Sequence, residues 1–153
     1  MNLMPITSSD IVAQARGWIG TPYRHQASLQ GIGCDCLGLV RGVWRALYGE
    51  EPEKMPAYSC DWAEAARVET LAEAGARHLI AVPHADMGAG DVLLFRWRKG
   101  LVAKHAAILT GDGTMIHAHD SAAVAEVAFA PWWRRRVAYV FRFPGVDIEG
   151  ASE

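Results

Sequence analysis

One cysteine in the chain stands where a fold can make a thiol nucleophilic. Cys36 follows Asp35, and apolar residues repeat behind it with helical spacing as far as Gly49. Asp is a favoured N-cap residue, so we expect a helix that begins at Cys36. A thiol at that place feels the partial positive charge of the helix N-terminus, which stabilises the nucleophilic thiolate. The pattern predicts a catalytic cysteine; a buried structural cysteine is the alternative.

A predicted β-hairpin carries the histidines that such a cysteine needs. The runs 105–109 and 114–118 read as strands, and Gly-Asp-Gly at 111–113 joins them. Gly113 suits the left-handed third position of a three-residue hairpin loop with a bulge. We therefore expect Thr110 to pair with Thr114.

This register decides where the histidines lie. It pairs Ala107 with His117 and His105 with His119, so all four share one face, and His105 lies roughly 7–8 Å from His117 at Cβ. A two-residue loop would place His105 and His117 on opposite faces and separate them. The three-residue loop therefore predicts a histidine cluster on one face of the sheet.

These residue types are those of a thiol acyl-transfer enzyme. A cysteine nucleophile needs an imidazole within hydrogen-bond reach and a third polar group that holds the imidazole in the right tautomer. Cys36, His105 and His117 fill these roles in that order, and the Cys36 backbone N–H is available to an oxyanion. We expect no metal and no cofactor.

Two other interpretations of the same residues stay open. Cys34 and Cys36 with His117 and His119 supply four zinc-type ligands, although C-x-C is tighter than the usual structural spacing. Alternatively, the histidines line a solvent-exposed sheet face, which is the favoured interpretation for His119. Residues 132–136, Trp-Trp-Arg-Arg-Arg, are either a docking surface or tryptophans packed under the domain with solvated arginines.

The whole chain indicates one ordinary globular domain. Its 153 residues are 51% apolar with a formal net charge of −2, which gives no reason to expect nucleic acid or an anionic membrane as a partner. Residues 1–10 have neither the basic region nor the apolar core of a secretory signal, so we expect synthesis in the cytoplasm. Three cysteines, an odd number, argue against a disulfide framework, and Cys60 is expected to pack quietly.

The elements around the cysteine and the hairpin suggest the fold class. We expect helices over 7–18, 36–48 and 62–74, with Thr7 and Asp10, and Asp61 and Glu64, as capping boxes. Strands are expected over 91–97, 105–109, 114–118, 123–128 and 137–143, and a frayed tail over 144–153. Helices followed by an antiparallel meander make an α+β fold, in which the sheet must cover the apolar face of the Cys36 helix.

Five short motifs, in order, resemble those of the NlpC superfamily of papain-like cell-wall peptidases. They are GTPY at 20–23, DCLGLV at 35–40, GDVLLF at 90–95, HAAIL at 105–109 and MIHA at 115–118. The resemblance covers residues 8 to 143. The sequence of residues 20–49 is similar to sequences of the family branch that is encoded among the tail genes of phages and gene-transfer agents.

The resemblance implies a papain-like fold, with Cys36 as nucleophile, His105 as base and His117 as the orienting third member. It places Tyr23 and Asp35 at the substrate-binding side of the nucleophile, where we interpret Asp35 as the helix cap. It further implies a cysteine peptidase that cuts the peptidoglycan stem peptide, commonly between γ-D-glutamyl and a diamino acid. In the tail-protein branch this is a virion enzyme, held by tail hub or baseplate proteins, that opens the wall for DNA entry.

Two departures and two alternatives accompany the resemblance. The family more often has Ser where Leu37 stands, and we see no separate wall-binding repeat domain. One alternative is a structural tail-tip or hub protein with the same fold and no turnover. The other is an amidase or acyltransferase that uses the same triad.

Overall fold

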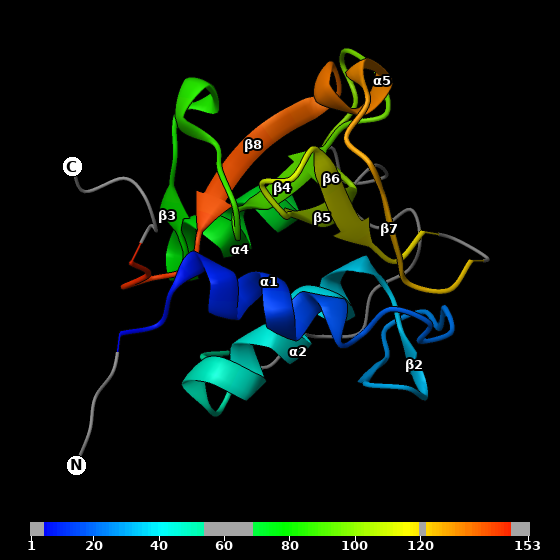
Figure 1. The fold of residues 1–153 in the computed structure, drawn as a ribbon. Coiled ribbons are helices and arrows are strands. Elements are labelled where there is room, and N and C mark those ends of the chain that lie inside the picture. The colour runs from blue at the N-terminus through cyan, green and yellow to red at the C-terminus, as the bar shows by residue number, and fades with distance from the viewer. Residues whose placement is uncertain (1–4, 54–68, 120–121, 148–153) are drawn as a thin grey trace.

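A computed structural model describes residues 5–53, 69–119 and 122–147. A six-stranded antiparallel sheet has helices α1 and α2 packed across one face (Figure 1). This arrangement confirms the predicted α+β class. The described helices are α1 (Ser8–Arg16), α2 (Cys36–Tyr48), α4 (Thr70–His78), the 3-10 turn η1 (His84–Asp86) and α5 (Pro131–Arg134). The strands are β1 (Ser28–Leu29), β2 (Gly33–Cys34), β3 (Ile80–Ala81), β4 (Val92–Phe95), β5 (His105–Leu109), β6 (Thr114–His117), β7 (Ala125–Ala128) and β8 (Val137–Arg142).

Helix α1 begins as its capping box predicts. The Thr7 hydroxyl accepts the Asp10 N–H, and the Asp10 carboxylate accepts the Thr7 N–H, which satisfies two N-terminal donors. The expected apolar stripe is buried, from Ile11 to Trp18. The helix ends at Arg16, two residues before its predicted end.

Helix α2 has the predicted bounds, and two of its glycines allow close packing. A Cβ on Gly38 would lie 1.9 Å from the Ala27 carbonyl oxygen, and one on Gly42 would lie 2.0 Å from the Trp18 ring. The loop before the helix and the end of α1 therefore approach the α2 backbone directly. The contact between Gly38 and the Ala27 carbonyl fixes the first turn of α2, which carries Cys36.

The strand order corrects the simple meander. The order is β3-β8-β4-β5-β6-β7, so β4 to β7 form the meander, but β8 returns to pair with β4 on the far side. A buried carboxylate anchors this return: Arg142 donates to Asp91 through Nε at 2.7 Å and Nη2 at 2.8 Å. Strand β3, in a segment whose pattern favours no element, pairs with β8.

The sheet separates two apolar clusters. The larger joins α1 and α2 to Val92, Leu94, Ala106 and Ile108, and the smaller gathers on the opposite face around Phe95. Strand β4 is buried on both faces, as its apolar run predicts. The face around Phe95 is covered by apolar side chains from outside the central strands: Val82, Met87, Phe129 and Trp133.

The remaining expectations are met in part. Helix α4 buries Leu71 and Ala72 as predicted, but it begins at Thr70 after a non-helical Glu69, so the predicted helix 62–74 is not continuous, and it continues to His78. Cys60, Asp61, Glu64 and residues 62–68 lie outside the described residues. The tail is not frayed as far as Asp147, because Asp147 pairs with Thr7 and its N–H donates to Ile6 at 2.8 Å. Of the described helices, none has the length and apolar character needed to cross a membrane.

The close approach at Gly38 gives a stability prediction. Gly38→Ala forces the Ala27 carbonyl away from α2, and overpacking of this kind costs about 1–3 kcal/mol. Gly88→Ala is the matched control, since a Cβ there meets nothing within 4 Å. Urea unfolding of both variants measures the difference. Equal free energies of unfolding for the two variants would contradict the packing role.

Candidate active site

The loop before α2 is tied to the helix by one buried carboxylate. Asp35 caps α2: its Oδ1 accepts the Gly38 N–H at 2.8 Å, and its Oδ2 accepts the Gln26 N–H at 2.6 Å. Gln26 has a φ of 67°, a conformation that is costly for a residue with a Cβ. This strained turn and the first turn of α2 are therefore held by the same side chain. The predicted capping role of Asp35 is confirmed, and its place in substrate binding stays a prediction.

Cys36 is the first residue of α2 and its side chain is half-buried. Burial, together with the smaller effect of the Asp35 charge, raises the pKa of its thiol to about 12. The backbone N–H groups of Ala106, Leu37 and Cys36 itself lower it. The donors at the helix terminus therefore favour the thiolate as expected, but loss of solvation outweighs them and the net pKa of the thiol is raised. Cys36 rests as a neutral thiol.

The hairpin has the predicted register. Ile108 pairs with Ile116 and Leu109 with Met115, and the Thr110 N–H donates to Thr114 at 3.0 Å. Gly113 has the positive φ that the third position of the predicted loop requires, and Gly111 has a positive φ as well, which the predicted turn does not require. The loop length thus places the two predicted catalytic histidines on the same face.

His105 and His117 meet directly. His105 Nε2 lies 2.9 Å from His117 Nδ1, and both side chains are buried. Burial lowers the pKa of His117 to about 4, with a further lowering from His119, and burial lowers that of His105 well below its ordinary value. Both imidazoles are therefore neutral near pH 7. A neutral imidazole has one acceptor nitrogen, which a general base requires.

The backbone of β5 connects the thiol to this pair. The Cys36 sulfur interacts with the backbone N–H of Ala106, the residue after His105. The β5 residues that pair with β6 come later in the strand, at Ile108 and Leu109. Cys36 packs with the α2 side of the core, whereas His105 contacts Phe95 of the opposite cluster. The structure brings His105 and His117 into contact, and the Cys36 sulfur contacts the backbone of the residue that follows His105.

Aromatic rings enclose the histidines, which the sequence reasoning missed. Trp97 stacks on His105 with ring centroids 5.3 Å apart, and Trp133 meets His117 edge-on at 5.2 Å. His119 is half-buried against the same rings, and its ring centroid lies 5.3 Å from that of His105. The expectation that His119 lies on a solvent-exposed face is therefore wrong. These tryptophans lower the local polarity. The Trp-Trp pair at 132–133 is the feature of the sequence that could have indicated an aromatic enclosure.

The segment 132–136 packs one tryptophan inside, as the second interpretation predicts, and the docking interpretation stays a prediction. Trp133 packs against Phe95 and the histidines, while Trp132 is 45% exposed. Arg136 lies over the Trp132 ring at 3.7 Å and donates to the Trp132 carbonyl at 2.8 Å. One tryptophan is therefore part of the site and the other is part of the surface beside it.

Tyr23 lies on the loop that approaches the nucleophile. It forms an isolated bridge with Cys34, two residues before Cys36, and its half-buried ring packs against the core on the α2 side. The resemblance places Tyr23 at the site beside the nucleophile, and this stays a prediction. Its contact with substrate stays a prediction.

The zinc interpretation finds no support in the described part of the chain. No group of three or more His, Cys, Asp or Glu side chains there has the geometry of a metal site. Cys34 is fully buried, and burial raises the pKa of its thiol to about 11, which disfavours the thiolate that a metal binds.

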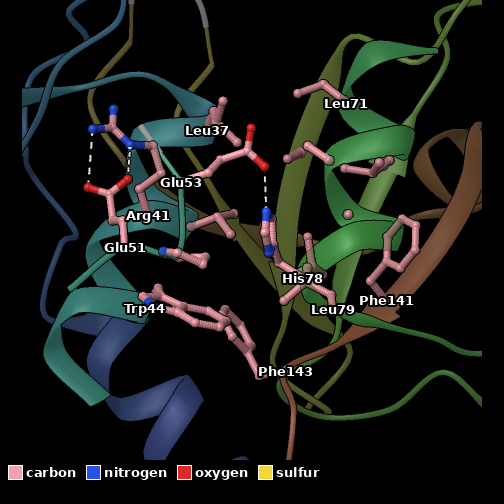
Figure 2. A pocket seen from close by; sticks show the side chains of 17 residues that line it. Leu37, Arg41, Trp44, Glu51, Glu53, Leu71, His78, Leu79, Phe141 and Phe143 are labelled. Carbon is pink, nitrogen blue, oxygen red and sulfur yellow. Dashed lines mark hydrogen bonds and ion pairs between the residues drawn. The ribbon is translucent and has the colours of Figure 1, made fainter. Parts of the chain in front are cut away.

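A separate apolar pocket lies between α2 and α4 (Figure 2). Trp44, Leu71, Phe141 and Phe143 line it, and ion pairs between Arg41 and Glu51 and between His78 and Glu53 stand at its rim. Leu37, the residue that replaces the family serine, also faces this pocket. Neither His105 nor His117 lines it, so we place the chemistry at the end of β5.

The comparisons with known proteins agree with this geometry. The model of the NlpC/P60 family matches residues 20–142, and the chain belongs to this family. Among solved structures, the NlpC/p60 domain of peptidoglycan hydrolase SagA superposes with a TM-score of 0.62 at 23% identity, over 90% of this chain and 100% of that one. An NlpC/P60 family protein from Bacillus cereus ATCC 10987 has a TM-score of 0.66 at 21% identity, over 93% of this chain and 42% of that one. These likenesses confirm the predicted papain-like NlpC-type fold.

Two curated relatives are similar in sequence. Gamma-D-glutamyl-L-lysine dipeptidyl-peptidase of Bacillus subtilis (strain 168) is 27% identical over 79% of this chain and 35% of its own length. Murein DD-endopeptidase MepS/Murein LD-carboxypeptidase of Escherichia coli (strain K12) is 27% identical over 84% of this chain and 58% of its own. The chain thus spans between a third and three-fifths of these relatives.

The buried neutral histidines predict a loss of stability in acid. An unfolded His binds a proton near pH 6.5, whereas folded His117 resists it down to about pH 4, so the unfolded state binds more protons between these values. The free energy of unfolding is therefore highest above pH 6.5 and falls toward pH 4, by on the order of 2 kcal/mol from His117. Urea titrations at pH 7, 5.5 and 4.5 measure this change.

The variant His117→Asn separates this effect from the carboxylates, which also titrate in acid. It removes one buried titratable group, so its free energy of unfolding should depend less on pH between 7 and 4.5. The same pH dependence in variant and wild type would show that His117 is not the source.

Proposed function

We propose that this protein is a cysteine peptidase that hydrolyses peptide bonds in the peptidoglycan stem. The observation that carries the proposal is the buried contact between His105 and His117 at the strand end that the Cys36 sulfur touches. Membership of the NlpC/P60 family and the peptidoglycan-related names of its relatives support the substrate class.

The geometry favours a general-base mechanism. His117 engages Nε2 of His105, which leaves Nδ1 of His105 for the Cys36 thiol. Because both groups rest neutral, His105 takes the thiol proton as the sulfur attacks the scissile carbonyl. The backbone N–H of Cys36 stabilises the tetrahedral oxyanion. His105 then gives the proton to the leaving amine, and water, activated by His105, hydrolyses the acyl-enzyme.

We further propose that the bond joins γ-D-glutamyl to a diamino acid. The name of the Bacillus subtilis relative supports this bond. The Escherichia coli relative carries names for other stem-peptide bonds, so the experiment must identify the bond and not only cleavage.

The particle in which the enzyme works is also a proposal. The sequence of residues 20–49 supports the proposal that the protein is a tail-tip component of a phage or gene-transfer agent. It would be made in the cytoplasm and act in the target cell envelope. Tail hub or baseplate proteins would be its partners. A structural tail protein without turnover, or an amidase or acyltransferase with the same triad, are the competing assignments.

Digestion of purified peptidoglycan with mass identification of the fragments tests the enzyme. Wild type should release stem fragments, and Cys36→Ala should release none while its unfolding curve stays close to that of wild type, because the nucleophile is lost without loss of the fold. Cys34→Ala is the matched control and should keep most of the activity, as should Cys60→Ala. Fragments from Cys36→Ala would overturn the mechanism, and transfer products without hydrolysis would favour the acyltransferase.

A further inference from the structure

A cationic hollow opens beside the histidines, on the side where Trp97 lies. It measures about 480 Å³. Five basic residues and one tryptophan form most of its lining: Arg96, Trp97, Arg98, Lys99, Arg135 and Arg136. We call this surface the Trp97 hollow.

We propose that the Trp97 hollow binds the carboxylate of the diamino acid in the leaving half of the substrate. The inference rests on the proposed function, because it concerns the specificity of the same site. It assigns a binding role to residues outside the catalytic cluster.

The hollow offers cations that are not already neutralised. Arg96 pairs with Glu69 at 3.1 Å, and Arg136 donates to the carbonyls of Trp97 and Trp132. Arg98, Lys99 and Arg135 are exposed, and within residues 5–53, 69–119 and 122–147 none of the three forms an ion pair with a carboxylate. These three charges stand together on a chain whose net charge is −2. An arrangement of this kind attracts an anion.

Trp97 joins the hollow to the proposed chemistry. One side of the ring stacks on His105 at a centroid distance of 5.3 Å with 24° between the planes. The same residue lines the hollow. A substrate group in the hollow would therefore lie beside a residue whose ring contacts the proposed base.

The direction of proton transfer determines which half of the substrate lies beside the Trp97 hollow. His105 must protonate the leaving amine, so the amine half lies on the His105 side of the scissile bond and the acyl half lies toward Cys36. In a γ-D-glutamyl–diamino acid bond, the leaving half is the diamino acid with its own carboxylate. Arginine binds a carboxylate through paired N–H donors, and the Trp97 ring covers the aliphatic part of the chain.

The experiment compares three γ-D-glutamyl–diamino acid peptides. One has both carboxylates free, one is amidated at the diamino acid carboxylate, and one is amidated at the glutamyl α-carboxylate. Each is tested with wild type, with Arg98→Gln/Arg135→Gln and with Arg134→Gln. Arg134 lies over Phe129 at 4.6 Å and outside the hollow, so it is the matched charge control.

In wild type and Arg134→Gln, amidation of the diamino acid carboxylate should lower kcat/KM about tenfold or more, mainly through KM. The double variant should show that loss already with the free peptide and lose little more on amidation. Amidation of the glutamyl carboxylate should lower kcat/KM equally in all three enzymes. An unchanged double variant, or equal losses on diamino acid amidation in all enzymes, would overturn the inference.

Binding separates this inference from the proposed function. Cys36→Ala is titrated with the free diamino acid, and NMR shifts of the tryptophan indole N–H groups report occupancy. Binding that Arg98→Gln/Arg135→Gln weakens about tenfold supports the hollow, even if no peptide is cut. Absence of binding, or binding that the double variant leaves unchanged, overturns the inference, even if the peptidase is active.

Discussion

The Asp35 carboxylate is the interaction on which the site depends. It caps α2 through Gly38 and also holds Gln26 in a strained conformation, so the loop and the helix share one anchor. The same negative charge lies beside Cys36 and opposes formation of the thiolate. The residue that positions the proposed nucleophile therefore adds to the effect of burial, which is the main reason that the pKa of the thiol is raised. A base must supply the missing activation, which explains why the position of the histidine pair matters so much.

Enclosure of that pair has a matching electrostatic effect. Trp97, Trp133 and Phe95 remove the imidazoles from water, and burial holds the pKa of both rings low. A neutral thiol beside a neutral base costs less to bury than an ion pair would. In the proposed mechanism, charge separates only while substrate is present, when backbone donors and the leaving amine compensate for it. The aromatic enclosure and the buried cap thus favour the same resting state.

Local rules predicted most of the elements, and long-range packing determined what they missed. The N-cap, the helical period and Gly49 located α2, and the count across Gly111–Gly113 gave the register that joins His105 and His117. The return of β8 to β4 depends on Arg142 reaching Asp91, a contact between residues 51 positions apart that no local pattern contains. The tryptophan enclosure comes from Trp97, outside any helix or strand, and from Trp133 in the four-residue helix α5, which is too short to show a period. The raised pKa of Cys36 required knowledge of its burial.

The short turn between β5 and β6 has a consequence for how this domain can vary in evolution. Because strand side chains alternate, loss or gain of one residue within 111–113 that shifts the pairing by one would reverse the face of His117 and His119 together. Substitutions there are limited mainly by the two positive-φ glycines, but a change in length separates the histidines at once. The turn is solvent-exposed and remote from the nucleophile, yet related sequences should keep its length as strictly as they keep the histidines.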